Sequence, residues 1–211
     1  MNDIIKNAKA IIMDLDGTII DAFEDVVEAV NITRRHYGLQ PLEFNEVVNF
    51  IGKGPTHLLK GTLPDDFDSR IDEALDVFKE AYRQLEDRNS RLFDGVIEFL
   101  DGTEGKVRAI LTNKLTELAK VVLDRFGILD RFDLVIGYDT TSYRKPDPKA
   151  LVWVLGALRV APHEAVYIGD SVVDADTAKG AGVPFILVKT GLYQDVTYYD
   201  VAVTRLDELL K

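Results

Sequence analysis

The feature of this 211-residue sequence that most restricts its fold is a series of short apolar runs separated by helical patterns. Short apolar runs that end at turn residues are typical of strands buried on both faces. Such runs lie at residues 9–15, 106–111, 132–136, 165–168 and 184–188, and a shorter sixth lies at 201–203. Strands that alternate with helices predict an α/β fold, here a Rossmann-like, doubly wound parallel sheet in three layers.

Helical periodicity fills the segments between most of these runs. One apolar stripe consists of Leu115, Leu118, Ala119, Val122 and Phe126. Asp147 and Pro148 form a typical helix start, with an N-cap followed by proline at the first helical position. We expect a helix over 150–158, with Trp153 in the core, and a short helix from Asp174 to Gly182.

One connection is much longer than a crossover requires. About ninety residues separate the first two apolar runs, whereas a parallel crossover needs only a dozen or more. This stretch carries two helical stripes, which comprise Phe23, Val26, Val27, Val30 and Tyr37, and Ile71, Ala74, Leu75, Phe78, Tyr82 and Leu85. We therefore expect a small, all-helical cap domain at 19–87, inserted after the first strand of a core domain at 1–18 and 88–211.

Composition excludes several classes of partner. Lys and Arg number 25 against 36 Asp and Glu, a formal net charge of −11. Nucleic acids and anionic membranes both require a basic surface, so neither is expected as a partner. The chain has no cysteine. It shows neither a signal peptide nor an apolar run of membrane-spanning length, so we expect a cytoplasmic protein. As a separate expectation, the protein is either a monomer or a homodimer.

Two carboxylates follow the first apolar run. Asp14 and Asp16 stand in the sequence DLDGT, and alternate residues of a strand share a face. Two neighbouring carboxylates repel by roughly 4 kcal/mol at an effective dielectric constant of 20, so they favour a cation or a shared proton. The alternative is ordinary Asp-Gly turn chemistry.

A second acidic pair follows the run at 165–168. Asp170 stands where the strand ends, and Asp174 follows four residues later in GDSVVD. Carboxylates from two strand ends suit Mg²⁺, which prefers one or two carboxylates together with water and phosphate. The alternative is a helix N-cap at Asp170 or Ser171 with Asp174 offsetting the helix dipole.

Polar and basic residues follow two further runs. Thr112 and Asn113 come directly after the second run and could bind an anion at a helix N-terminus, or simply cap that helix. Lys145 precedes Pro146 in RKPDP, and it could neutralise phosphate or lie on the surface of a proline-rich loop. Each of the four motifs follows the carboxyl end of a predicted parallel strand, so we expect all four to meet at one edge of the sheet. Together they indicate Mg²⁺-assisted phosphoryl transfer.

The four motifs DLDGT, LTN, RKPDP and GDSVVD resemble, in order and context, those of the haloacid dehalogenase superfamily phosphatases. The resemblance covers the core, and the helical insert resembles the small cap domain of that superfamily. Within it, IGKG at 51–54 and GYDTTSYRKPDPKAL at 137–151 are most similar to the phosphoglycolate phosphatases. One departure is Ala22, where relatives often carry serine.

The resemblance implies a role for each motif residue. Asp14 would be the nucleophile, and Asp16 would protonate the leaving oxygen and later activate water. Asp14, the main-chain carbonyl of Asp16 and Asp170 would hold Mg²⁺, and Asp174 would orient this group or Lys145. The phosphate would be bound by three residues: Thr112, Asn113 and Lys145.

The cap would select the substrate, and Lys53 is our candidate for contact with a substrate carboxylate. We therefore expect a Mg²⁺-dependent phosphatase for a small phosphorylated metabolite, with 2-phosphoglycolate as the best single candidate. Alternatives are a phosphomutase of the β-phosphoglucomutase type and a phosphatase for sugar phosphates or nucleotides. A phospho-acceptor signalling module is less well supported, because such modules are much shorter and lack a ninety-residue insert. An inactive binding protein is also less well supported, because every motif residue is present.

Overall fold

The structure, a computed structural model, describes residues 1–85, 88–191 and 195–211, and it divides the chain into two compact units. Unit 1 comprises Met1–Ile20 and Leu92–Lys211, and unit 2 comprises Asp21–Arg91. The chain passes between them at β2 (Ile20–Asp21) and β3 (Arg91–Leu92), which form a two-stranded sheet. The domain boundary expected at residue 87 lies outside the described residues, and the cap assignment stays a prediction.

Unit 1 is built on a six-stranded parallel sheet in the order β5-β4-β1-β6-β7-β8. Its strands are β1 (Ala10–Met13), β4 (Val107–Leu111), β5 (Leu134–Ile136), β6 (Ala165–Gly169), β7 (Phe185–Val188) and β8 (Val201–Val203). Each apolar run expected to be a strand is one. The prediction of a Rossmann-like α/β fold with a parallel sheet is confirmed.

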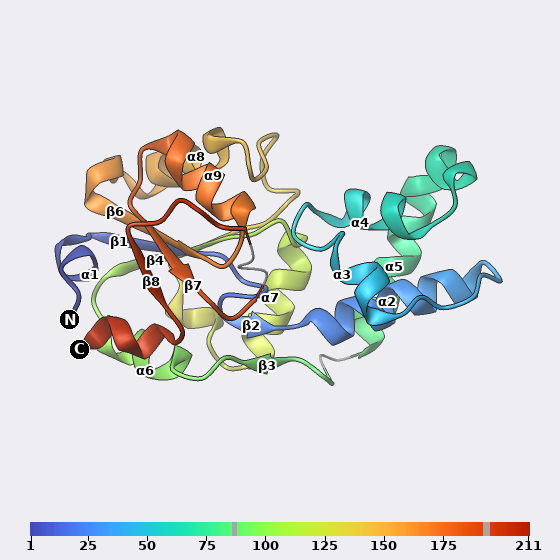
Figure 1. Cartoon of the computed structure of the whole chain (residues 1–211), viewed down its shortest axis with the longest axis horizontal. Coiled ribbons are helices and arrows are strands. Elements are labelled where there is room, and N and C mark those ends of the chain that lie inside the picture. The colour runs from blue at the N-terminus through green and yellow to red at the C-terminus, as the bar shows by residue number, and fades with distance from the viewer. Residues whose placement is uncertain (86–87, 192–194) are drawn as a thin grey trace. The chain divides into compact units, whose positions relative to one another are not determined.

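Helices cover both faces of this sheet (Figure 1). The α-helices are α1 (Asp3–Asn7), α6 (Val96–Gly102), α7 (Thr116–Arg125), α8 (Pro148–Leu158) and α9 (Val172–Ala181). Unit 1 also contains short 3₁₀ helices: η2 (Leu129–Arg131), η3 (Pro162–Glu164) and η4 (Leu206–Leu210). Helices α8 and α9 lie together over one face, and α6 lies with η4 over the other.

Local sequence explains where the two helices nearest the motifs begin. The side chain of Asp147 caps α8 by accepting a hydrogen bond from the main-chain N–H of Lys149, as the sequence predicts. Ser171 caps α9, and its hydroxyl accepts from the main-chain N–H of Asp174. Helix α9 ends at Ala181 and is capped by Gly182, whose φ of 66° lies in the left-handed region that glycine adopts without strain.

The core of unit 1 forms because the strands are apolar on both faces. Alternate residues of β1 belong to a cluster that packs against α8 and α9, and all four residues of this strand are buried. The cluster receives Ala150, Leu151, Val154 and Leu155 from α8. The expectation that Trp153 lies in the core is wrong, because it falls outside this stripe and is 41% exposed.

Four neighbouring strands place the sequence motifs at one edge of the sheet. Strands β5, β4, β1 and β6 are neighbours and run parallel, so their carboxyl ends lie side by side. The segments that follow them carry Lys145, Thr112, Asp14 and Asp170, respectively. The carboxyl edge of a parallel sheet is where open α/β folds bind their ligands.

Unit 2 is helical. It consists of α2 (Phe23–His36), α3 (Phe44–Val48), α4 (Pro55–Thr62), η1 (Asp65–Arg70) and α5 (Ile71–Leu85). The two longest helices, α2 and α5, pack against each other through the apolar stripes seen in the sequence. Val26, Val27 and Val30 of α2 and Ala74, Phe78 and Tyr82 of α5 are buried.

A buried carboxylate joins the beginning and the end of unit 2. Asp25, in the first turn of α2, is completely buried. It accepts hydrogen bonds from the main-chain N–H of Asn89 at 3.2 Å, from Asn89 Nδ2 at 3.0 Å and from Ser90 Oγ at 2.5 Å. These bonds tie the segment that leaves unit 2 to the helix that enters it.

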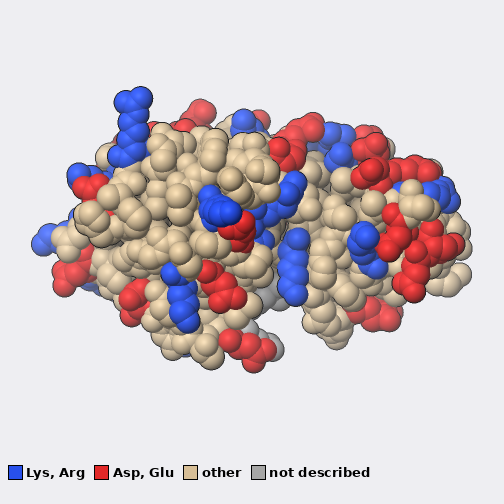
Figure 2. Space-filling view, turned by 90° about the horizontal axis from the view of Figure 1, so that it is seen from above, with Lys and Arg blue, Asp and Glu red and all other residues tan. Residues whose placement is uncertain are grey.

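Charge is distributed unevenly over the surface. Figure 2 shows acidic side chains gathered over η1 and α5 of unit 2, where Asp65, Asp66, Asp68 and Asp72 are exposed. Part of the acid excess is therefore a solvated coat. Among the described helices, none combines the length and apolar character that a membrane span requires.

We predict that Asp25→Ala lowers the free energy of unfolding by about 1–3 kcal/mol, because it removes the hydrogen bonds that Asn89 and Ser90 donate to a buried charged acceptor. Glu24→Ala is the matched control, since Glu24 is exposed in the same helical turn and its loss should cost no more than about 0.5 kcal/mol. Urea unfolding measures both variants. Equal destabilisation by the two variants would contradict the prediction.

Candidate active site

The first motif begins where β1 ends. The main-chain N–H of Asp14 donates to the carbonyl of Ile168 at 2.9 Å, which extends the ladder between β1 and β6 by one residue. The chain then turns at Gly17, whose φ is 86°. A Cβ there would lie 2.4 Å from Asp170 Oδ2, so only glycine fits between the turn and this carboxylate. Thr18 is buried and donates its hydroxyl hydrogen to Asp170 Oδ1 at 3.0 Å.

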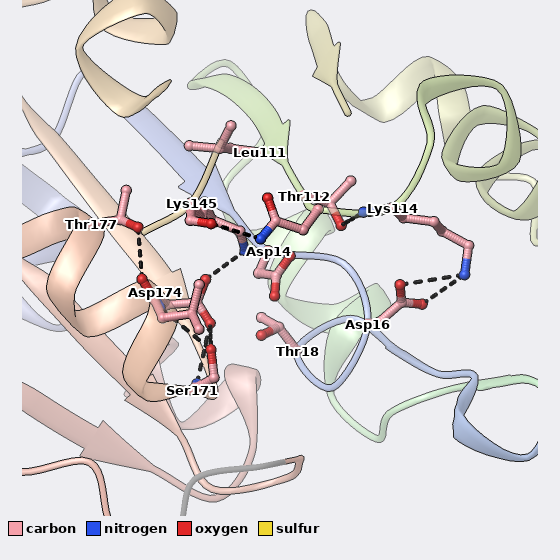
Figure 3. Close-up of polar contacts among 12 residues, drawn as sticks. Asp14, Asp16, Thr18, Leu111, Thr112, Lys114, Lys145, Ser171, Asp174 and Thr177 are labelled. Carbon is pink, nitrogen blue, oxygen red and sulfur yellow. Dashed lines mark hydrogen bonds and ion pairs between the residues drawn. The ribbon is translucent and has the colours of Figure 1, made fainter. Parts of the chain in front are cut away.

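Lys145 lies at the centre of the site (Figure 3). Its side chain is only 2% exposed, and its ammonium lies 2.8 Å from Asp14 Oδ1 and 2.6 Å from Asp174 Oδ1. Asn113 Nδ2 donates to the carbonyl of Lys145 at 2.9 Å and so holds the loop that carries the lysine. A residue that sequence alone could place on the surface is therefore the buried counter-ion of two carboxylates.

Asp174 is fully buried, and both of its oxygens accept hydrogen bonds from this chain. Oδ1 accepts from Lys145 Nζ and from the hydroxyl of Tyr167 at 2.8 Å. Oδ2 accepts from the main-chain N–H of Ser171 at 3.1 Å and from its hydroxyl at 2.5 Å. Asp174 therefore holds Lys145 in place, and the turn that begins α9 holds Asp174.

Three carboxylates crowd this part of the site. One oxygen each of Asp14, Asp170 and Asp174 lies within 4.8 Å of the others, and all three residues are buried. Two unit charges at that separation repel by about 3 kcal/mol at an effective dielectric constant of 20. The buried ammonium of Lys145 offsets one of these three charges, and hard oxygen donors in this arrangement fit a divalent cation.

In this crowded site the pKa values of both Asp14 and Lys145 are raised. Burial raises the pKa of Asp14 to about 7; the ammonium of Lys145 opposes this increase, and the charge of Asp174 adds to it. Burial would lower the pKa of Lys145, but Asp14 and Asp174 together raise it above its usual value. Asp14 Oδ1 accepts no well-aligned hydrogen bond from any described residue, although Lys145 lies beside it. A cation would satisfy this oxygen.

The second motif lies between the first and the third. Thr112 and Asn113 are buried, and the main-chain N–H of Thr112 continues the ladder to β5 by donating to Ile136 at 2.9 Å. The Thr112 hydroxyl accepts from the main-chain N–H of Lys114 at 3.1 Å. Helix α7 begins only at Thr116, so the motif forms a turn before the helix.

Asp16 lies apart from the acidic group, with its carboxylate turned toward Lys114 (Figure 3). Lys114 Nζ donates to its two oxygens at 3.0 and 3.3 Å. The expectation that Asp14 and Asp16 share a face assumes strand geometry, whereas β1 ends at Met13. The turn that follows directs the two carboxylates differently.

The structure brings together seven of the eight residues that the sequence singled out. Six of them form the acidic group or lie next to it: Asp14, Thr112, Asn113, Lys145, Asp170 and Asp174. Asp16 lies beside them in the same unit. Lys53 belongs to unit 2, where it is exposed between Gly52 and Gly54, and its contact with substrate stays a prediction.

Four further residues make contacts in the site that the sequence did not predict. They are Thr18, Lys114, Tyr167 and Ser171 in its bonds to Asp174. Tyr167 had a usable signal, since a hydroxyl within a buried strand requires a partner. Lys114 stands directly after Asn113, but nothing in the sequence shows that its ammonium turns back to Asp16.

Comparison with known proteins agrees with this geometry. The family model described as haloacid dehalogenase-like hydrolase matches residues 11–188. A protein of Thiobacillus denitrificans named phosphoglycolate phosphatase is 33% identical over 190 residues, which cover 87% of this chain and 84% of the relative. A protein of Rhodobacter capsulatus with the same name is 35% identical over 189 residues, covering 87% and 85%.

A solved structure from Bacteroides fragilis, described as a haloacid dehalogenase-like hydrolase, has a TM-score of 0.86 and 25% identity. The match covers 96% of this chain and 99% of that one. This chain belongs to the haloacid dehalogenase-like hydrolase family. The family and the curated relatives place it among the phosphoric monoester hydrolases.

We predict that stability without metal depends on pH through Asp14. Its pKa is about 7 in the folded protein and 3.8 for the ordinary carboxyl, so the folded state holds a proton that the unfolded chain has released. This contribution is fully present below about pH 4 and is lost as the pH rises through about 7. Urea unfolding in EDTA should show that, as the pH rises over this range, the free energy of unfolding of wild type falls relative to that of Asp14→Asn by on the order of a few kcal/mol. A difference that does not change with pH would contradict this assignment.

We predict that Tyr167→Phe lowers the free energy of unfolding by about 1–3 kcal/mol, because the buried Asp174 loses one donor while the ring is kept. Tyr199→Phe is the control, since Tyr199 is exposed and its loss of a hydroxyl should cost no more than about 0.5 kcal/mol. Denaturant titration at one pH compares the two variants. Equal values would show that the Tyr167 hydroxyl does not stabilise the site.

Proposed function

We propose that this chain is a Mg²⁺-dependent phosphatase that hydrolyses 2-phosphoglycolate through an aspartyl-phosphate intermediate. The observation that carries the proposal is the buried group of Asp14, Asp170 and Asp174, in which three carboxylates crowd together and the ammonium of Lys145 pairs with two of them. The names of the two curated relatives support the choice of substrate.

The acidic group would hold the metal through Asp14, Asp170 and the main-chain carbonyl of Asp16. When bound, Mg²⁺ would supply positive charge that offsets the phosphate oxygens and the nucleophile. Asp174 already accepts from several donors of this chain. Its part would therefore be to orient Lys145, whose ammonium would share the charge of the phosphate.

In the first half of the reaction, a carboxylate oxygen of Asp14 would form a bond to phosphorus while the bond from phosphorus to the substrate oxygen breaks. The leaving oxygen would take a proton from Asp16 and depart as an alcohol. Thr112 and Asn113 would bind the phosphate oxygens during this transfer, because they follow β4 next to Asp14 at the same edge of the sheet.

In the second half, water would attack the phosphorus of the aspartyl phosphate and lose its proton to Asp16. The bond between phosphorus and Asp14 would break, which restores the carboxylate and releases inorganic phosphate. Asp16 thus gives one proton and regains one. The sum is a phosphate monoester plus water, giving an alcohol plus inorganic phosphate.

We further propose that unit 2 acts as the cap and selects the substrate, with Lys53 as a contact to the substrate carboxylate. Lys53 stands between two glycines with φ values of 97° and 93°, in the loop between α3 and α4. Its exposed ammonium is available to an anion from solvent.

The purified protein with Mg²⁺ should release inorganic phosphate from 2-phosphoglycolate. EDTA should abolish the activity, and added Mg²⁺ should restore it. Asp14→Asn should lower kcat by at least about a thousandfold, because the amide replaces the nucleophile without changing its shape. Asp176→Asn is the control, since Asp176 is exposed on α9, and it should retain activity.

Full activity of Asp14→Asn, or of the metal-free protein, would contradict the proposed mechanism. Isomerisation of a sugar phosphate without release of phosphate would identify a phosphomutase instead. A panel of sugar phosphates and nucleotides, assayed beside 2-phosphoglycolate, tests the substrate. A kcat/KM for any of them well above that for 2-phosphoglycolate would overturn that part of the proposal.

A further inference from the structure

The ion pair between Lys114 and Asp16 is largely withdrawn from solvent. The side chain of Lys114 is 6% exposed and that of Asp16 is 16% exposed. The ammonium lies 3.0 and 3.3 Å from the two carboxylate oxygens, so it contacts both of them. An ion pair withdrawn from water pays a desolvation penalty, and it is weak support for stability alone.

The main chain of Lys114 is held on both sides. Its N–H donates to the Thr112 hydroxyl at 3.1 Å, and its carbonyl accepts from the main-chain N–H of Tyr138 at 2.8 Å. A Cβ on Gly137 would lie 2.6 Å from the Lys114 carbonyl oxygen, which shows how closely this turn packs against the lysine. The ammonium is therefore presented from a rigid base, as a recognition group requires.

We propose that Lys114 is a further specificity-determining residue, which binds the substrate carboxylate next to the leaving oxygen in addition to the contact proposed for Lys53. The substrate class is phosphate monoesters of small 2-hydroxy acids, of which 2-phosphoglycolate is the smallest. This inference rests on the proposed function and on the part assigned there to Asp16.

Distances support this assignment. A group that protonates the leaving oxygen must approach it to about 3 Å. The Lys114 ammonium lies 3.0 Å from Asp16, so it comes within about 6 Å of that oxygen. In a 2-hydroxy acid ester the carboxylate oxygens lie about 3 Å from the leaving oxygen, as standard bond lengths dictate. One further contact of about 3 Å joins the carboxylate to the ammonium.

The ion pair also explains why a second anion would favour the reaction. Asp16 engages Lys114 with both oxygens, and it must turn at least one of them to the leaving group. Without a replacement, that movement weakens the bonds to a buried ammonium. A substrate carboxylate takes the place of Asp16 beside Lys114, whereas a neutral substrate offers no such group. Lys114 thus makes the release of Asp16 depend on the substrate.

Two substrates that differ only in charge test the proposal. The amide of 2-phosphoglycolate, phosphoglycolamide, keeps the size of the acid but lacks its charge. Wild type should show a kcat/KM roughly 10- to 100-fold higher for the acid, the range for a hydrogen bond to a charged group. In Lys114→Met this ratio should fall several-fold, although Lys53 is kept, and Lys114→Arg should retain most of it. The ratio cancels any effect of the substitution on Asp16 that both substrates share.

Lys120→Met is the control, because Lys120 is an exposed lysine of α7, and it should leave the ratio unchanged. If Lys114→Met does not fold, Lys114→Gln, which keeps donors without the charge, provides the same comparison. A wild-type ratio near one, or an unchanged ratio in the uncharged Lys114 variant, overturns the proposal. Failure of wild type with Mg²⁺ to hydrolyse either substrate would instead contradict the proposed function itself.

Discussion

The buried ammonium of Lys145, between Asp14 and Asp174, is the interaction on which the rest of the site depends. Without it, three crowded carboxylates would face one another in a buried environment, and even with it burial raises the pKa of Asp14 to about 7. The ammonium connects the third motif to the first and the fourth. It thereby fixes the positions of three loops that are far apart in the sequence.

The surrounding structure serves to hold this charge in place. Asp174 accepts hydrogen bonds from Ser171 and Tyr167 in addition to Lys145. The N-cap of α9 and the middle of β6 therefore both hold the carboxylate that positions the lysine. The glycine at position 17 allows Asp170 to approach the turn, where a Cβ would displace it. Such support from outside the reacting groups is what keeps a catalytic geometry rigid. The excess negative charge that remains explains why the site suits a divalent cation.

Much of the fold follows from local patterns. Continuous apolar runs predict strands buried on both faces, and the structure contains a parallel sheet built from all of them. Asp147 predicts the start of α8 because proline follows the N-cap, and both are local effects. Trp153 shows the limit of this reasoning. Its helix is apolar on several sides, and only the packing of α8 against the sheet decides that Trp153 is 41% exposed.

The sequence by itself determined the class of fold and the chemical groups of the site, because strand periodicity and motif order are local and sequential. The convergence of the four motifs also follows, since parallel strands bring their carboxyl ends to one edge. Only the tertiary structure decided which groups pair. That Lys145 joins Asp14 to Asp174, while Asp16 turns to Lys114, depends on turns that follow the strands. Their directions arise from contacts between distant segments, which no local pattern records.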